Sequence, residues 1–150
     1  MQTRLAAAAA FALTLCAPPA ARAQDTAGVR AAALDYIEGF YTGDSTRHIR
    51  SVRPEVYKFG FSRHRDSTSY RPGTQMTWEG FHRYTHGVRE RGGRGAPPNA
   101  PKDVRIFEVL DKTASAKVTA WWGTDYLLLA RYDGRWMITH VLWQSPPPKG

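Results

Sequence analysis

The fold is decided by residues 125–143, which read DYLLLARYDGRWMITHVLW. Two apolar runs flank Asp133-Gly134, and Asp-Gly is a two-residue turn that suits the right-handed twist of a β-hairpin. With this pair as the loop, Leu129 lies opposite Ile138. Further from the turn, the same register puts Asp125 opposite Leu142.

Both faces of this hairpin are mostly apolar. A sheet with one face in water alternates apolar and polar residues, so each face here needs a cover. Helices can cover one face, and a second copy of the chain is the economical cover for the other. The hairpin therefore predicts a homodimer that packs sheet against sheet.

The rest of the chain divides at a Gly-, Pro- and Arg-rich loop over residues 91–101. Helical patterns precede the loop, with Asp25 or Thr26, Asp44 or Ser45, and Thr77 as N-caps. Gly43 is expected to end the first helix. Strands are expected over residues 56–61, 104–110, 114–130 and 135–144. This order predicts an α+β fold with N-terminal helices packed on an antiparallel sheet.

The first 23 residues are typical of a secretory signal peptide. Residues 5–15 form a compact apolar run, prolines follow it, and Ala21-Arg22-Ala23 fits the small-residue cleavage pattern. The run is shorter than the roughly 20 residues of a spanning helix, so no membrane span is expected. We expect cleavage near Ala23, export to the periplasm or out of the cell, and one domain over residues 24–150.

Cys16 is the only cysteine of the chain. It follows Leu15, where lipid attachment requires a small residue, so free export ranks above a lipid anchor. Cleavage after Ala23 removes Cys16, and the remaining chain then has no disulfide, thiol nucleophile or thiolate metal site.

Positive charge is concentrated in the middle of the chain. The formal net charge is +8, and residues 47–94 hold eleven Lys and Arg against four acidic residues. Such a segment forms either an anion-attracting rim around a cleft or a solvated face, and the solvated face is the more common case.

Four segments resemble, in order and spacing, the bacterial lumazine-binding family of the nuclear transport factor 2-like superfamily. They are ALDYIEGFYTGD at 33–44, ASAKV at 114–118, DYLLL at 125–129, and DGRWMI at 133–138 with Leu142-Trp143. The resemblance implies a cone-shaped curved sheet, helices in its concave side, a pocket between them and frequent dimerisation. The superfamily includes ketosteroid isomerases, polyketide cyclases, dehydratases and binding proteins, so it selects no activity.

Asp125 and His140 are the candidate catalytic pair. In the hairpin register they share one face at a diagonal that long side chains can bridge. An aspartate there could orient an imidazole as a general base, and a purely structural pair is the alternative. A bulge near Trp121-Trp122-Gly123 is needed to turn this face toward the core.

Aromatic residues are the candidate ligand-binding set, because a cone-shaped fold leaves room for a planar ligand to stack. They are Tyr36, Phe40, Tyr57, Trp122, Tyr126 and Trp136, with Trp143 of the same type. Ordinary core packing is the alternative for all of them.

Metal and nucleic-acid sites are weakly indicated. His82 and His86 have a ligand-like spacing, but they lie toward the charged side of their expected helix, so no metal or other cofactor is expected. The run from Lys58 to Phe61 resembles only part of an RNA-binding strand, and export disfavours nucleic acid as a partner.

Together these patterns predict an exported, dimeric protein that binds a small aromatic or apolar molecule in a pocket rimmed by basic residues. The alternative is an isomerase, cyclase or dehydratase that uses Asp125 and His140 in that pocket. A purely interacting protein with a filled core and no pocket is the third hypothesis.

Overall fold

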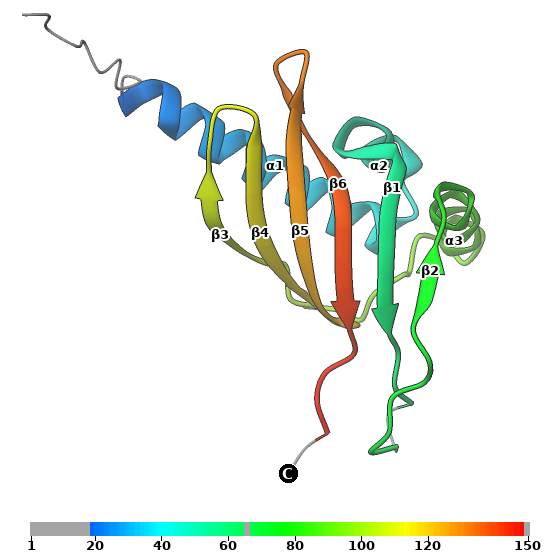
Figure 1. Ribbon diagram of the computed structural model, residues 1–150. Helices are drawn as coiled ribbons and strands as arrows, with labels where there is room; N and C mark the ends of the chain where they lie inside the picture. Colours follow the sequence, from blue (N-terminus) through cyan, green and yellow to red (C-terminus); the bar gives the residue numbers. More distant parts are fainter. Residues whose placement is uncertain (1–18, 65–66, 149–150) are drawn as a thin grey trace, which may run out of the picture.

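The computed structural model describes residues 19–64 and 67–148 (Figure 1). The expected apolar run of the signal peptide, with Cys16, lies outside these residues. The described part contains α1 (Pro19–Thr42), α2 (Ser45–Ser51), β1 (Val52–Phe61), β2 (Thr74–Met76), α3 (Trp78–Glu90), β3 (Asp103–Val109), β4 (Thr113–Ala120), β5 (Gly123–Tyr132) and β6 (Arg135–Gln144). Helices and strands pack as layers, which confirms the predicted α+β class.

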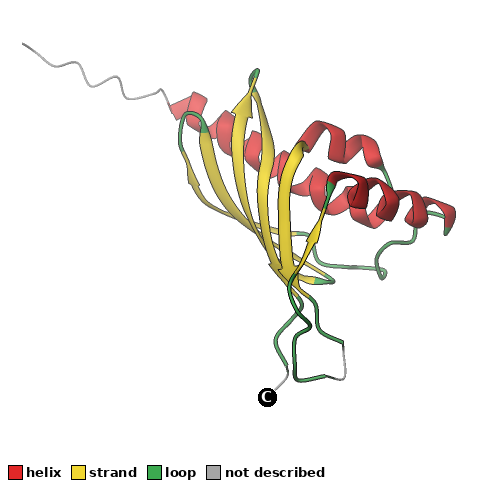
Figure 2. Cartoon of the chain, turned by 45° about the vertical axis from the view of Figure 1, so that its right-hand side comes forward, coloured by secondary structure: helices red, strands yellow, loops and turns green. Residues whose placement is uncertain are grey.

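The sheet has the strand order β2-β1-β6-β5-β4-β3. All neighbours are antiparallel except β1 and β6, which are parallel. Figure 2 shows the helices on one side of the curved sheet. The core lies between these layers, and its largest fully buried side chains include Tyr36, Ile37, Phe81, Leu127, Leu129 and Ile138.

Local signals set most helix ends. Gly43, with φ of 72°, ends α1 as expected. Asp44 caps α2 by accepting a hydrogen bond from the Thr46 amide, and Thr77 caps α3. The expected start of α1 at Asp25 or Thr26 is wrong. The helix begins at Pro19, because proline suits the first helical position and no breaker follows it.

The Asp133-Gly134 hairpin is confirmed between β5 and β6. Both turn residues have positive φ, 48° and 79°, as a type I′ turn requires. Leu129 pairs with Ile138, but the register then shifts at a bulge that contains Thr139. Asp125 therefore pairs with Trp143, and the predicted pairing with Leu142 is wrong.

The single strand expected over residues 114–130 is also wrong. The chain turns at Trp121 and Trp122, and Ala120 pairs with Gly123 across the resulting β4–β5 hairpin. Gly123 has φ of 142°, and a Cβ there would lie 1.9 Å from the Gln144 carbonyl oxygen. The turn thus needs glycine. Even-numbered residues face the core before the turn, on β4, and odd-numbered residues face it after the turn, on β5.

Strand β1 begins directly after α2, earlier than expected, and it contains Pro54. The pairing of β1 with β6 is interrupted between Val52 and Tyr57, so Pro54 removes no hydrogen bond between these strands. The short strand β2, at the sheet edge beside β1, was not expected from the sequence.

The outer face of the sheet carries no helix (Figure 2). Several large apolar side chains on this face are about half exposed. These are Tyr57 on β1, Tyr126 and Leu128 on β5, and Leu142 on β6. They form the apolar outer face referred to below.

Candidate functional site

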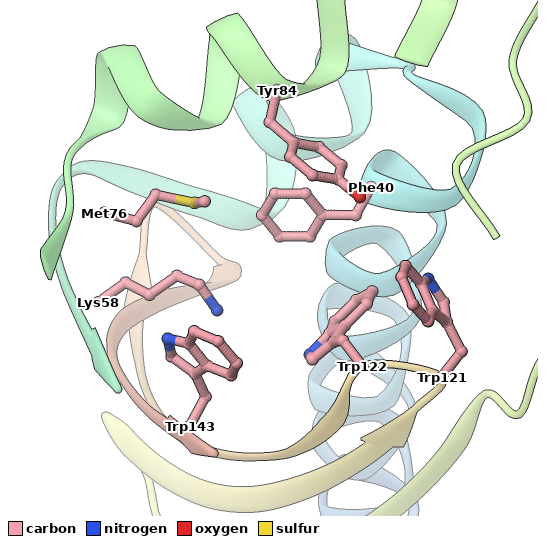
Figure 3. A pocket seen from close by; sticks show the side chains of 7 residues that line it. All are labelled: Phe40, Lys58, Met76, Tyr84, Trp121, Trp122 and Trp143. Atoms are coloured by element: carbon pink, nitrogen blue, oxygen red, sulfur yellow. The ribbon is translucent and has the colours of Figure 1, made fainter. Parts of the chain in front are cut away.

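A cavity of about 200 Å³ lies between the helices and the concave face of the sheet (Figure 3). Its lining comes from α1, β1, β2, α3, the β4–β5 turn and β6. The described residues that line it are Phe40, Lys58, Met76, Tyr84, Trp121, Trp122 and Trp143. Five of the seven are aromatic, and Lys58 is the one charged member of this set.

Strand alternation explains how Lys58 enters the cavity. Val56, Lys58 and Gly60 face inward along β1, whereas Tyr57 and Phe61 face outward. Lys58 is only 4% exposed. A buried lysine requires compensation, because transfer of an ammonium out of water is costly.

Asp125 and Tyr36 provide that compensation. The Lys58 ammonium donates hydrogen bonds to Tyr36 Oη at 2.5 Å and to Asp125 Oδ2 at 3.1 Å. Tyr36 in turn donates to Asp125 Oδ2, and Asp125 is 0% exposed. The three side chains form a closed polar cluster beside an otherwise apolar cavity.

Trp122 connects this cluster to the cavity wall. Its indole N–H donates to Asp125 Oδ1 at 2.7 Å. Its ring makes edge contacts with Phe40 and Tyr41, each at 5.5 Å between centroids. The hydrogen bond and these contacts hold the wall in one orientation before any ligand arrives.

The Lys58 ammonium also lies over three aromatic rings. Its nitrogen is 5.2 Å from the Tyr36 centroid, 5.6 Å from Phe40 and 5.3 Å from Trp143. Cation–π attraction at these distances stabilises the ammonium. The position that an external cation would take among these rings is therefore already filled by the protein.

Burial controls the protonation of the site. It raises the pKa of Tyr36 well above its ordinary value, with Asp125 adding to the effect, so this hydroxyl stays protonated. It lowers the pKa of Lys58, although Asp125 opposes the change. A cation paired with an anion is the resting state, and the site is close to neutral overall.

His48 lies behind the cavity and takes no part in its lining. Burial lowers its pKa to about 4, so the imidazole is neutral at pH 7. Its Nε2 lies 3.1 Å from the Tyr36 carbonyl oxygen, and its ring contacts Phe40 and Phe81. His48 thus supports the α1 turn that presents Tyr36 and Phe40.

The predicted aromatic residues are divided between several locations. Phe40 and Trp122 line the cavity, and Tyr36 lies beneath it in the polar cluster. Tyr57 and Tyr126 are on the apolar outer face, so the expectation that they face a shared pocket is wrong. Side chains alternate between the two faces along a strand, and Tyr57 and Tyr126 occupy positions that point away from the helices.

Trp136 is buried, but it packs away from the cavity, against Gly28 of α1. Among the described residues, its indole nitrogen is the buried side-chain polar atom without a hydrogen-bond partner. Its placement is that of a core residue.

The predicted Asp125–His140 pair is wrong. Asp125 faces the core, whereas His140 is exposed on the outer face, where it pairs with Leu128 across the ladder. The Thr139 bulge adds one residue to β6, and this reverses the direction of every side chain beyond it.

Four lining residues were not predicted from the sequence: Lys58, Met76, Tyr84 and Trp121. The sequence does contain a pattern that could have indicated Lys58. It shares its strand face with Val56 and Gly60, which is the face that points toward the core. The others come from a helix, an edge strand and a turn that only tertiary packing brings together.

A wider groove adjoins the cavity and shares Trp121, Trp122 and Trp143 with it. The C-terminal segment forms one wall of this groove. Arg63 holds that segment by donating hydrogen bonds to the Pro146 carbonyl oxygen at 2.9 and 3.2 Å. The groove provides a route between the three tryptophans and solvent.

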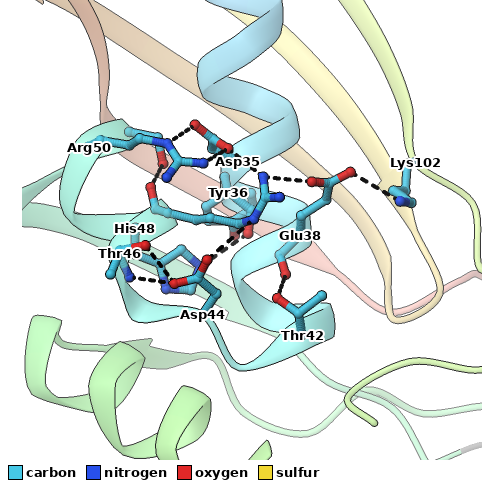
Figure 4. A network of polar contacts seen from close by, with 11 residues as sticks. Asp35, Tyr36, Glu38, Thr42, Asp44, Thr46, His48, Arg50 and Lys102 are labelled. Carbon is cyan, nitrogen blue, oxygen red and sulfur yellow. Dashed lines mark hydrogen bonds and ion pairs between the residues drawn. The ribbon is translucent and has the colours of Figure 1, made fainter. Parts of the chain in front are cut away.

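Some of the basic segment is used in ion pairs near the surface, which Arg47, Arg50 and Arg53 form. Arg50 binds Asp35 (Figure 4). Arg47 also binds Asp35, and it binds Glu38 at 2.6 Å. Of the segment's described cations, Lys58 reaches the cavity and Arg63 reaches the groove. The predicted basic rim is therefore limited to these two side chains.

Within the described residues, no group of three or more His, Cys, Asp or Glu side chains is arranged to hold a metal ion. His86 instead lies 3.5 Å from Glu90 on the exposed side of α3.

Among the described residues, no helix combines the length and apolar character needed to cross a membrane.

This architecture is similar to the fold of solved nuclear transport factor 2-like proteins. A protein of this class of unknown function from Shewanella baltica superposes with a TM-score of 0.62 at 19% identity, over 84% of this chain and 97% of its own. Another, from Silicibacter pomeroyi, gives 0.58 at 14% identity, over 83% and 98%. A Nostoc punctiforme protein of unknown function with a cystatin-like fold gives 0.55 at 12% identity, over 83% and 93%.

The chain belongs to the family described as "Putative lumazine-binding", which residues 24–144 match. The resemblance inferred from the sequence is thereby confirmed. Among functionally curated proteins, none matches this chain.

Proposed function

We propose that the protein binds a small, planar, uncharged aromatic molecule in the cavity. The observation that carries the proposal is a set of five aromatic side chains arranged around one buried ammonium. Aromatic walls favour stacked or edge-on packing of a flat ring. The remaining N–H of Lys58 can donate to a carbonyl or ring nitrogen of the ligand.

The size of the cavity limits the ligand to one or two rings. Its volume of about 200 Å³ is below the roughly 300–1,000 Å³ of pockets that enclose drug-sized ligands. The charge of the site limits the ligand further. Lys58 repels a cation, and an anion would compete with Asp125 for the same ammonium. An uncharged ring with a hydrogen-bond acceptor is the best fit.

Lumazine is the first ligand to test, because the family name specifies it and because it is a flat bicyclic dione. Titration of the purified protein by isothermal calorimetry should give saturable binding. Trp143→Ala should weaken that binding about tenfold or more, since a stacked aromatic contact and its buried area are lost. Phe107→Ala is the control and should bind normally, because Phe107 is 50% exposed on β3 and does not line the cavity.

Equal affinity in the Trp143→Ala and Phe107→Ala variants would place binding outside the cavity. A set of one- and two-ring diones and lactams, none of which binds, would overturn the proposal as a whole.

We also propose that the apolar outer face forms a homodimer. Tyr57, Tyr126, Leu128 and Leu142 are 49–54% exposed, and a contiguous apolar patch on a sheet is typical of an interface. A two-fold symmetric contact would cover this face with the same face of a second copy. Light scattering should give a dimer, and Leu128→Glu should give a monomer.

Leu110→Glu is the matched control for dimerisation. Leu110 is also 54% exposed, but it lies beyond the end of β3, away from the centre of the sheet. A wild-type monomer at high micromolar concentration would contradict the proposed interface.

We further propose that the protein is exported, with cleavage after Ala23. The family match starts at residue 24, directly after this site, and Val29 is the first core residue of α1. The exported chain should begin at Gln24 by intact mass. Ala23→Glu should block processing, whereas Arg22→Ala should not, because the specificity lies in the small residues on either side.

A further inference from the structure

Lys58 is chemically distinct from the other lysines of the chain. The sequence contains five lysines. Lys102, Lys112 and Lys117 are exposed or half-buried, and Lys149 lies outside the described residues. Lys58 is buried, and Figure 3 shows its nitrogen pointing into the cavity toward Trp143 and Trp122.

A lysine acts as a nucleophile only as the neutral amine. An apolar environment favours this form, and burial lowers the pKa of Lys58. The proton also has a destination, since Asp125 Oδ2 lies 3.1 Å from the nitrogen. Transfer of the proton turns the ion pair into a neutral amine beside a carboxylic acid, with no other group required.

We infer that Lys58 captures aromatic aldehydes and ketones in the cavity as a reversible Schiff base. This inference rests on the proposed function, because the ring of the ligand must first occupy the aromatic cavity. It adds a chemical class to that function: the ligand presents a reactive carbonyl group toward the floor of the cavity.

The reaction balances without an oxidant or a reductant. After Asp125 has accepted one proton, the Lys58 lone pair forms a C–N bond to the carbonyl carbon while the C–O π electrons move to oxygen. Protonation of that oxygen gives a carbinolamine. The oxygen then leaves as water with the two hydrogens of the amine, and a C=N bond remains. Asp125 can return its proton to the imine nitrogen and then act as its counter-ion.

The neighbours of Lys58 suit each step of this capture. Tyr36 keeps its proton, and once Asp125 is protonated the Tyr36 hydroxyl can turn from Asp125 to donate to the carbonyl oxygen as charge develops there. The released water can leave through the groove that shares three tryptophans with the cavity.

The test is reductive trapping with a small carbonyl probe. The full protein is incubated with benzaldehyde and sodium cyanoborohydride, and the modified lysines are mapped by peptide mass spectrometry. We expect one adduct, with the mass of the probe less one oxygen, at Lys58. Its yield should exceed that at Lys102 by about tenfold or more, because burial lowers the pKa of Lys58 and the cavity holds the probe beside its nitrogen.

Two controls separate capture from binding. Benzyl alcohol has the same ring without a carbonyl, so it should compete with benzaldehyde but form no adduct. Lys58→Arg keeps the positive charge beside Asp125 but has no amine that can form an imine, so the adduct at this position should be lost. Thermal unfolding by circular dichroism shows whether this variant is folded.

The outcomes distinguish this inference from the proposed function. Calorimetric binding of benzyl alcohol together with labelling spread over the exposed lysines would overturn the Schiff base and leave the binding proposal intact. Absence of binding for both probes would overturn both proposals. A saturable adduct at Lys58 that benzyl alcohol suppresses supports both.

Discussion

Asp125→Asn is the substitution that tests the buried polar cluster most directly. It leaves the Lys58 ammonium in an apolar cavity without its counter-charge, and it weakens the acceptor for Tyr36 and Trp122. Asn keeps a carbonyl oxygen that can still accept from the Trp122 indole. The shape of the side chain is otherwise unchanged, so the effect reports charge and hydrogen bonding rather than packing.

The expected loss is large. Removal of one partner from a buried ion pair costs about 3–5 kcal/mol, and the retained Trp122 hydrogen bond favours the lower end, about 3 kcal/mol. For a domain of this size, one kcal/mol changes Tm by about 3–4 °C, so a decrease on the order of 10 °C is expected.

The loss should also depend on pH. Burial already lowers the pKa of Lys58, and removal of Asp125 lowers it further. Between that lowered pKa and the ordinary value near 10.4, the unfolded state binds more protons than the folded state. Stability of the variant therefore rises with pH in this window, and its deficit relative to wild type should be smaller at pH 9 than at pH 7.

The assay is urea unfolding followed by circular dichroism at both pH values. Asp35→Asn is the matched control, because Asp35 also binds cations, Arg47 and Arg50, but at the surface. We expect a loss of about 0–1 kcal/mol there. A loss below about 1 kcal/mol for Asp125→Asn, or a deficit that grows with pH, would refute the buried-pair argument.

Three further predictions concern single residues around the site. The folded-state pKa of His48, about 4, is below its unfolded value of about 6.5, so its contribution to stability is present above pH 6.5 and lost as the pH falls to 4. Urea midpoints should decrease over this window by the equivalent of about 3 kcal/mol, and less steeply in His48→Gln. Trp122→Phe keeps an aromatic ring but removes the indole N–H that donates to Asp125, and calorimetry should show a loss of about 1.5–3 kcal/mol in the free energy of unfolding. Gly43→Ala should lower Tm strongly, because a Cβ would lie 2.7 Å from two backbone atoms of α3. Gly134→Ala has open space around it and should lose only about 1 kcal/mol from its positive φ.

The sequence predicted the elements that local rules specify. The Asp133-Gly134 turn, the Gly43 helix stop and the Asp44 and Thr77 caps depend on backbone conformation and on side chains a few residues away. The order of helices before strands then gave the α+β class. Four segments, though individually weak, together indicated the family that the match over residues 24–144 shows.

The site was predicted only in part. Phe40, Trp122 and Asp125 face the core, as the predicted site requires, but His140 and Tyr126 face outward. The Thr139 bulge and the Trp121-Trp122 turn each changed the direction of the residues that follow. Neither has a local signal comparable to Asp-Gly, because a bulge forms where cross-strand packing favours an extra residue.

The sequence by itself determined the fold class, the main turn and caps, and the family, because these depend on short-range backbone preferences and on hydrophobic periodicity. Only the tertiary structure decided which side chains meet. It brought Lys58 of β1, Asp125 of β5 and Tyr36 of α1 into one buried cluster beside an aromatic cavity. These residues are 22 to 89 positions apart in the chain. Such distant contacts depend on strand register and sheet curvature, which local sequence does not specify.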